Sequence, residues 1–135
     1  MIRYWAAVAI VASLAATVAT ANESVDPSSP EYKRGRLLYI QCRACHDLKP
    51  SEVQKVGPNL AGMMGRQAAQ DPRFAYSAAL LAAAPTLRWD AATLDRWLEK
   101  PAAVVPGNTM AFAGIANPAD RAALITYIKA ESRSP

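Results

Sequence analysis

The two cysteines and the single histidine of this chain lie within five consecutive residues. Cys42 and Cys45 are three positions apart, and His46 directly follows the second cysteine. Residues with this spacing project from the same face of a helical turn. The two thiols can therefore form thioether bonds to the two vinyl groups of one porphyrin, and the imidazole can bind its iron. The motif predicts one covalently attached haem c.

Three other interpretations of the motif have less support. A dithiol redox site is expected in a βαβ setting, and no alternating strand pattern occurs near Cys42. A structural zinc ion needs about four ligands, whereas the chain has two cysteines and one histidine. A structural disulfide between Cys42 and Cys45 is the third alternative, and it stays open at this point.

Residues 1–21 have the pattern of a secretory signal peptide. Arg3 gives a basic start, residues 4–18 are mostly apolar, and residues 19–21 (Ala-Thr-Ala) form a cleavage site of small residues. The alternative is an uncleaved anchor, because the apolar run is nearly long enough to cross a bilayer as a helix. We therefore expect a periplasmic protein, with anchoring to the periplasmic face of the inner membrane as the alternative.

Cleavage after Ala21 leaves 114 residues, which suffice for one small domain with a modest apolar core. We predict a polar, flexible lead-in over 22–29 and one domain over 30–135, in which a buried porphyrin would supply much of the core. Loss of Arg3 lowers the formal net charge from +4 to +3. Such a mild basic excess does not indicate a nucleic-acid partner.

Capping residues and apolar periodicity predict an all-α chain of four or five helices without strands. Each predicted helix has Ser, Asp or Asn at its start, where these residues favour an N-cap. Long loops between helices are unusual in a small domain, but loops that wrap around a cofactor are accounted for. The predicted helices run from Pro30 to the cysteine motif, over 77–84 with a stop at Pro85, over 91–99 with a stop at Pro101, and over 118–131 after a loop at 102–114.

An iron that is bound by His46 keeps an open sixth position unless a second residue closes it. The mature chain offers mainly Met63, Met64 and Met110, although a methionine is more often a core residue than a ligand. We favour Met110, because a Pro-Gly turn precedes it in a loop between two helices, where the backbone can approach a haem face. Met63 is the second candidate.

Several short segments between Gly35 and Lys129, including the cysteine motif, follow one another in an order that is typical of a known family. They are 42–46 (Cys-Arg-Ala-Cys-His), 57–60 (Gly-Pro-Asn-Leu), 65–66 (Gly-Arg), 74–77 (Phe-Ala-Tyr-Ser), 106–110 (Pro-Gly-Asn-Thr-Met) and 121–129. With them the chain resembles the class I c-type cytochromes, most of all the mitochondrial cytochrome c and bacterial cytochrome c2 group. The resemblance implies a cytochrome c fold of four to five helices wrapped around one haem c, with crossed N- and C-terminal helices.

The resemblance also implies roles for residues of the haem pocket. Pro58 would accept a hydrogen bond from the imidazole nitrogen of His46 that faces away from the iron, which orients the ring. Arg66, Tyr76 and Trp89 match positions that enclose the haem propionates. These carboxylates would be costly to bury without such partners.

The chain departs from the mitochondrial proteins in the pocket and at the exposed haem edge. Trp97, a pocket residue, stands where they carry a tyrosine, and Leu80 stands where they carry an asparagine, so hydrogen-bonding groups near the iron are lost. Ala102, Ala103 and Thr109 occupy positions where lysines are usual. We therefore expect docking of redox partners to be less sensitive to salt than in the mitochondrial proteins.

If His46 and Met110 both bind the iron, no position is open for a substrate. This ligand set predicts a monomeric one-electron carrier and not an enzyme. The expected partners are a quinol-cytochrome c reductase or a dehydrogenase as donor and a cytochrome oxidase or another acceptor. Two alternatives stay open: a haem that binds small ligands or peroxide after displacement of Met110, and a dedicated haem subunit of a larger redox complex.

Overall fold

The computed structural model describes residues 25–133, so the predicted signal peptide lies outside the described part. Within that part, the regular structure is helical except for one isolated antiparallel bridge between Gln67 and Arg88. The predicted all-α class is confirmed. The helices are α1 (Pro30–Leu38), α2 (Ala78–Ala83), α3 (Ala91–Glu99), α4 (Pro101–Val104) and α5 (Pro118–Glu131), and 3₁₀ turns follow α1 at Tyr39–Gln41 and α2 at Ala84–Thr86.

Side-chain caps fix where four of these helices begin. In each case a side-chain oxygen accepts a hydrogen bond from a backbone N–H of the first turn, which otherwise has no partner in the helix. The caps are Ser29 on Tyr32 (3.2 Å), Ser77 on Leu80 (3.2 Å), Asp90 on Thr93 (2.7 Å) and Asn117 on Ala119 (2.9 Å). Just before α1, inside the predicted flexible lead-in, Ser28 donates two hydrogen bonds to the carboxylate of Asp26 and forms a turn.

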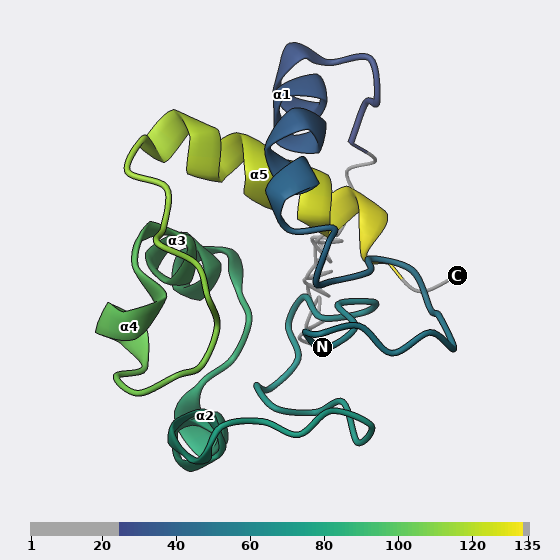
Figure 1. Ribbon diagram of the computed structural model, residues 1–135. Helices are drawn as coiled ribbons and strands as arrows, with labels where there is room; N and C mark the ends of the chain where they lie inside the picture. Colours follow the sequence, from purple (N-terminus) through teal and green to yellow (C-terminus); the bar gives the residue numbers. More distant parts are fainter. Residues whose placement is uncertain (1–24, 134–135) are drawn as a thin grey trace, which may run out of the picture.

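α1 crosses α5 at one end of the molecule (Figure 1). Gly35 makes the close approach possible, because a Cβ atom at this position would overlap the carbonyl oxygen of Ala123. Beside it, the rings of Tyr39 and Tyr127 lie 5.6 Å apart between centroids. The crossing of the N- and C-terminal helices, expected from the resemblance, is present.

Two prolines were expected to stop helices, and both α-helices do end before them, α2 at Ala83 and α3 at Glu99, but each proline also lies in a further short helical turn. Pro85 lies inside the 3₁₀ turn that follows α2. Pro101 begins α4, so the prediction of a loop directly after α3 is wrong for the first residues of 102–114. The helix does break at Lys100, whose backbone is extended with φ −160°. Proline is well suited to the first position of a helix, because its missing N–H would have no partner there.

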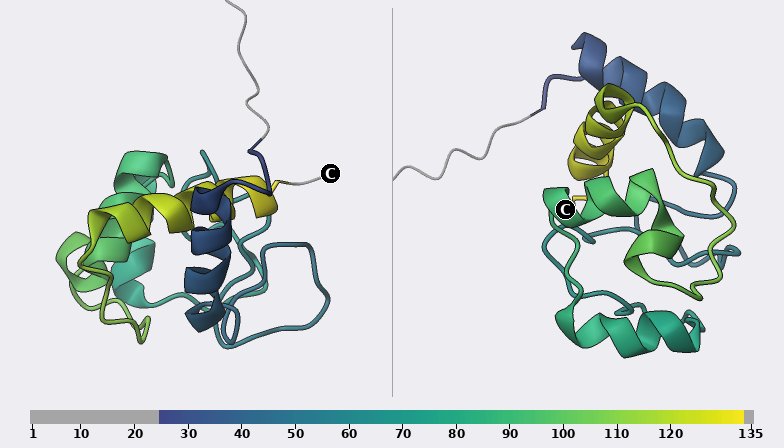
Figure 2. Two further views of the ribbon diagram at one scale, coloured as in Figure 1. Left: turned by 90° about the horizontal axis from the view of Figure 1, so that it is seen from above. Right: turned by 90° about the vertical axis from the view of Figure 1, so that its left-hand side faces the viewer.

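The core lies between α3 and α5. Leu94, Trp97 and Leu98 on one face of α3 are buried, as their spacing predicts, and they pack in one cluster with Leu124 and Ile128 of α5. The crossing of α1 and α5 lies at one end of the molecule and α2 at the other, with long loops between them (Figure 2). In the described range, no helix has both the length and the apolar character needed to cross a bilayer.

Candidate haem site

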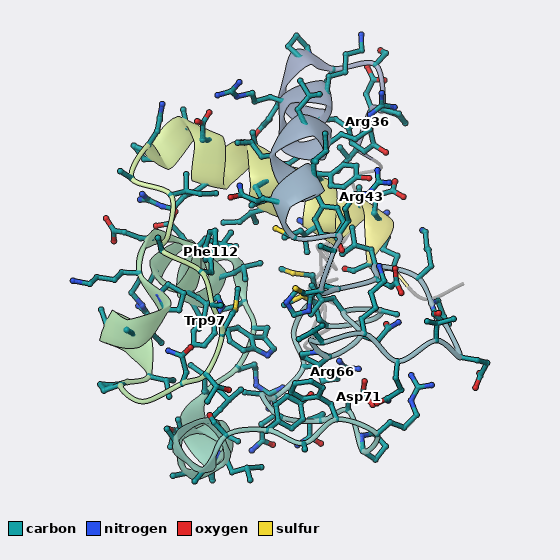
Figure 3. The ribbon with its side chains drawn as sticks, viewed as in Figure 1. Arg36, Arg43, Arg66, Asp71, Trp97 and Phe112 are labelled. Atoms are coloured by element: carbon teal, nitrogen blue, oxygen red, sulfur yellow. The ribbon has the colours of Figure 1, made fainter. Side chains whose placement is uncertain are left out.

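All nine residues predicted for the site line one cavity of about 270 Å³. The walls between them are mostly apolar, as is usual where a protein binds a large, mostly apolar group. Figure 3 shows Trp97 and Phe112 at one side of the central space, and Arg66 and Asp71 at the end far from α1 and α5. The nine residues are Cys42, Cys45, His46, Pro58, Arg66, Tyr76, Trp89, Trp97 and Met110.

Backbone hydrogen bonds fold the cysteine motif into one tight turn after α1. The N–H groups of Cys45 and His46 both donate to the carbonyl of Cys42, at 3.0 and 2.9 Å. The hydroxyl of Tyr39 donates to the carbonyl of His46 at 2.9 Å, which connects the turn to the helix crossing. Both cysteines are free thiols. Burial, and then the neighbouring Cys45, raises the pKa of the Cys42 thiol to about 11.

The ring of His46 is held in the tautomer that a metal ligand needs. Its Nδ1 lies 2.8 Å from the carbonyl oxygen of Pro58. A carbonyl can only accept, so Nδ1 carries the proton and Nε2 keeps its lone pair free for iron. Burial lowers the pKa of His46, against the opposing effect of the Pro58 hydrogen bond. The ring is therefore neutral at neutral pH, as iron binding requires.

Gly57 allows the loop that carries Pro58 to lie flat against this ring. A Cβ atom on Gly57 would overlap Cε1 of His46 and would stand 2.8 Å from its Nδ1. The N–H of Gly57 also donates to the carbonyl of Cys45 at 2.9 Å. From the sequence, Gly57 is only part of a turn-rich loop. Its role depends on the ring that packs against it, and no local pattern shows that contact.

The far end of the cavity carries polar groups that suit a carboxylate. The hydroxyl of Tyr76 accepts a hydrogen bond from the N–H of Asp71 at 3.1 Å, so its own proton remains available to an acceptor. The Nε of Arg66 is buried and has no hydrogen-bond partner within residues 25–133. Such a buried donor costs about 1–3 kcal/mol when it has no acceptor. A haem propionate would supply one, so these residues fit the group.

Loop pairing fixes the positions of Arg66 and Trp89. The N–H of Trp89 donates to the carbonyl of Arg66 at 2.9 Å, and the N–H of Gly65 donates to the carbonyl of Trp89 at the same distance. The ring of Trp89 meets the ring of Trp97 edge to face, with centroids 5.2 Å apart. Trp97 and Leu80, the two departures from the mitochondrial pattern, both line the cavity.

Met110 lies in a turn that is organised by Asn108. The side chain of Asn108 donates to the carbonyl of Val105 at 2.8 Å and accepts from the N–H of Met110 at 3.1 Å. Met63 also lines the cavity, but it is buried within the apolar core cluster, and Met64 does not line the cavity. Two of the three candidate methionines therefore remain, and Met110 is the one on a loop outside the core.

The family model for cytochrome c matches residues 32–132. The chain belongs to the cytochrome c family. The predicted resemblance to class I c-type cytochromes is thereby confirmed, and the cofactor of this family is one covalently attached haem c. The two thiols, the neutral imidazole and the unpaired Arg66 nitrogen described above fit that cofactor.

Known cytochromes are similar to this one over most of its described length. Cytochrome c2 from Rhodomicrobium vannielii is 42% identical over 95 residues, which cover 70% of this chain and 74% of the relative. Cytochrome c from Cochliobolus lunatus is 36% identical over 101 residues, which cover 75% and 92%. The solved structure of cytochrome cH from Methylobacterium extorquens has a TM-score of 0.65 at 36% identity and covers 73% of this chain and 96% of that one. This cytochrome is an electron-transfer protein of the cytochrome c2 type and not an enzyme.

Proposed function

We propose that this cytochrome is a one-electron carrier whose haem iron is bound by His46 and Met110. One observation carries the proposal: both side chains line the same cavity as the thiols of Cys42 and Cys45. A haem c in this cavity supplies an iron that changes between ferrous and ferric states. If both residues bind the iron, no position would be left for a substrate.

Each group of residues has a distinct task in this proposal. The two thiols anchor the porphyrin through thioether bonds, and the Pro58 carbonyl orients the His46 ring by its hydrogen bond of 2.8 Å. Arg66 and Tyr76 hold the negative propionates. The mostly apolar walls would exclude water from the haem, so little solvent reorganisation would accompany electron transfer.

The alternative of a ligand-binding haem requires the loop that carries Met110 to open. Gly114, at the far end of this loop, lies directly on α3, because a Cβ atom there would overlap the carbonyl oxygen of Glu99. The N–H of Ile115 donates to the carbonyl of Leu98 at 2.8 Å. These contacts hold the loop in place and favour the carrier over the ligand-binding alternative.

The proposed partners are a quinol-cytochrome c reductase or a dehydrogenase as donor and a cytochrome oxidase or another terminal acceptor. The proposed location is the periplasm, after cleavage of residues 1–21. The similarity to bacterial cytochromes c2 supports the partners and the location, and the pattern of residues 1–21 supports the location. Intact mass of the exported protein tests the cleavage, and co-purification at high salt would favour a dedicated subunit of a larger complex over a free carrier.

The ligand set is tested with protein from a host that attaches haem to Cys-x-x-Cys-His motifs. Absorption spectra of the oxidised and reduced protein are compared with those of Met110→Ala and Met63→Leu. Leucine replaces methionine in a core at small cost. We expect the mass of the chain plus one haem, and a weak sulfur-to-iron band at the red end of the ferric spectrum. Added cyanide should leave the fresh spectrum unchanged.

The two variants separate the candidate methionines. Met110→Ala should lose the sulfur-to-iron band and bind cyanide, whereas Met63→Leu should keep the band. The opposite result would assign the iron to Met63. A wild-type ferric spectrum that is high-spin and responds to cyanide would support the ligand-binding alternative, and a mass without haem would exclude both.

A further inference from the structure

The peptide bond between Pro58 and Asn59 has a hydrogen-bond partner on each side. Its carbonyl oxygen accepts from Nδ1 of His46 at 2.8 Å. Its N–H donates to Oδ2 of Asp71 at 3.3 Å. A carboxylate, a peptide group and an imidazole thus form one continuous hydrogen-bonded chain. The chain ends at the ring nitrogen opposite the one that faces the proposed iron.

Asp71 is buried, with 8% of its surface exposed, and it is ionised. Burial by itself raises the pKa of its carboxyl group, but the N–H groups of Arg73 and Asn59 and the charge of Arg73 together lower that pKa below its ordinary value. Oδ1 accepts from the N–H of Arg73 at 3.0 Å, and the Arg73 guanidinium lies 3.5 Å away. A negative charge is therefore fixed at neutral pH on Asp71, at the outer end of the hydrogen-bonded chain.

We propose that Asp71 sets the electron-donor strength of His46 through the peptide group between Pro58 and Asn59. The negative charge polarises this peptide, so the Pro58 carbonyl becomes a stronger acceptor and draws the Nδ1 proton more firmly. The ring then carries more negative charge and stabilises ferric over ferrous iron. No proton is transferred. Asp71 is a positioning residue, and its effect rests on the proposed ligation of the iron by His46.

The decisive variant is Asp71→Asn, which removes the charge and keeps the size of the side chain and an oxygen that can accept. Two quantities are measured on the haem-loaded protein: the reduction potential, and the chemical shift and exchange rate of the His46 Nδ1 proton in the ferrous form. At a given potential, we expect a three- to tenfold shift toward ferrous protein, which corresponds to about 28–59 mV for a one-electron couple. The Nδ1 proton should move upfield and exchange faster.

Glu52→Gln is the matched control. Glu52 also faces Arg73, at 3.9 Å, but its side chain is fully exposed and makes no contact with the peptide group. Its removal changes the same local charge without breaking the hydrogen-bonded chain. We expect little change in the potential and none in the Nδ1 proton.

A second variant separates the hydrogen bond from the charge. Asp71→Glu keeps the negative charge but displaces the carboxylate, so the Nδ1 hydrogen bond should weaken although the charge remains. The proposal is overturned if Asp71→Asn changes the potential while the Nδ1 proton stays as in the wild type, because the charge then acts through space alone. An unchanged potential overturns it as well. Failure of the proposed function itself would already be visible in the wild type, as missing haem or missing histidine ligation.

Discussion

A Cβ atom on Gly35 would stand 2.7 Å from the Cβ of Tyr127, so α1 and α5 meet at their crossing without space for another carbon atom. The next turn of the chain leads directly to the haem motif. The Tyr39 ring packs against Tyr127, and its hydroxyl donates to the carbonyl of His46 at 2.9 Å. The crossing of the terminal helices and the proposed iron ligand are therefore one connected unit.

Replacement of Gly35 by alanine should destabilise the protein although alanine favours a helix. The overlap with the Ala123 carbonyl forces the helices apart, and overpacking of this kind costs about 1–3 kcal/mol. The gain in helix propensity is only about 1 kcal/mol. We expect a net loss of up to about 2 kcal/mol in the free energy of unfolding, measured with denaturant on the haem-loaded protein. Lys33→Ala, an exposed change in the same helix, should have almost no effect; equal stabilities of the two variants would contradict the close crossing.

The helix boundaries that the sequence predicts correctly depend on local chemistry. Asp90 and Asn117 each bond to backbone N–H groups within three residues, so the starts of α3 and α5 can be found without knowledge of the fold. The helix ends before Pro85 and Pro101 were also predicted correctly, but the short helical turns that contain these prolines were not, because a proline is equally compatible with the residues after one helix and with the first turn of the next. Only the path of the chain after each helix decides between the two.

The residues of the site also fall into those that local sequence predicts and those that it does not. Cys42, Cys45 and His46 are close in sequence and could be assigned from spacing alone. Asp71 could not, because its contact with the N–H of Asn59 joins residues 12 positions apart in two irregular loops. No periodicity or capping rule brings such loops together. Gly57 was missed for the same reason.

Tyr32 should give the protein a pH-dependent stability in the alkaline range. Its hydroxyl donates to Glu131 at 2.7 Å and joins α1 to the end of α5. This hydrogen bond, followed by burial, raises the pKa of Tyr32 to about 12. A raised tyrosine pKa means that the folded state favours the neutral phenol. The stabilisation is therefore complete below the unfolded pKa of about 10 and is lost as the pH rises through the folded pKa.

The Tyr32→Phe variant isolates this contribution. At pH 7 it should be less stable than the wild type by about 1 kcal/mol, the usual net contribution of one hydrogen bond. The difference should shrink as the pH rises from about 10 toward 12, and denaturant unfolding at several pH values measures it. A difference that stays constant over this range would show that the phenol is not held neutral by Glu131.

The protein should be less stable with alanine at position 69 than with glycine. The φ of Ala69, 57°, lies in the left-handed region, which costs an L-residue about 1–2 kcal/mol. Glycine opposes the gain from removing this cost by about 0.4–1 kcal/mol, because it increases the conformational entropy of the unfolded chain. Ala69→Gly should therefore raise the free energy of unfolding by about 0.5–1 kcal/mol. Its neighbour Ala68 is fully buried with an ordinary φ, so Ala68→Gly should destabilise; a loss of stability in both variants would contradict the strain at Ala69.

The cavity rim, defined as the exposed residues among those that line the cavity, carries no charge. Its members are neutral and come from four separate segments of the chain, and Val56 among them is 82% exposed. A neutral surface cannot steer a charged partner over distances beyond about 8–10 Å, the range to which salt limits electrostatic attraction. The rim consists of Gln41, Val56, Gln70, Thr109 and Ala111.

Electron transfer between this cytochrome and a cytochrome oxidase should accordingly depend only weakly on ionic strength. The bimolecular rate constant is measured from low to physiological salt, where an association steered by opposite charges slows steeply. Thr109→Lys places a positive charge on the rim and should steepen the salt dependence toward an acidic partner. Ala122→Lys adds the same charge on the exposed side of α5, away from the cavity, and should leave the slope unchanged. A steep slope in the wild type would mean that partners recognise a charged surface other than the rim.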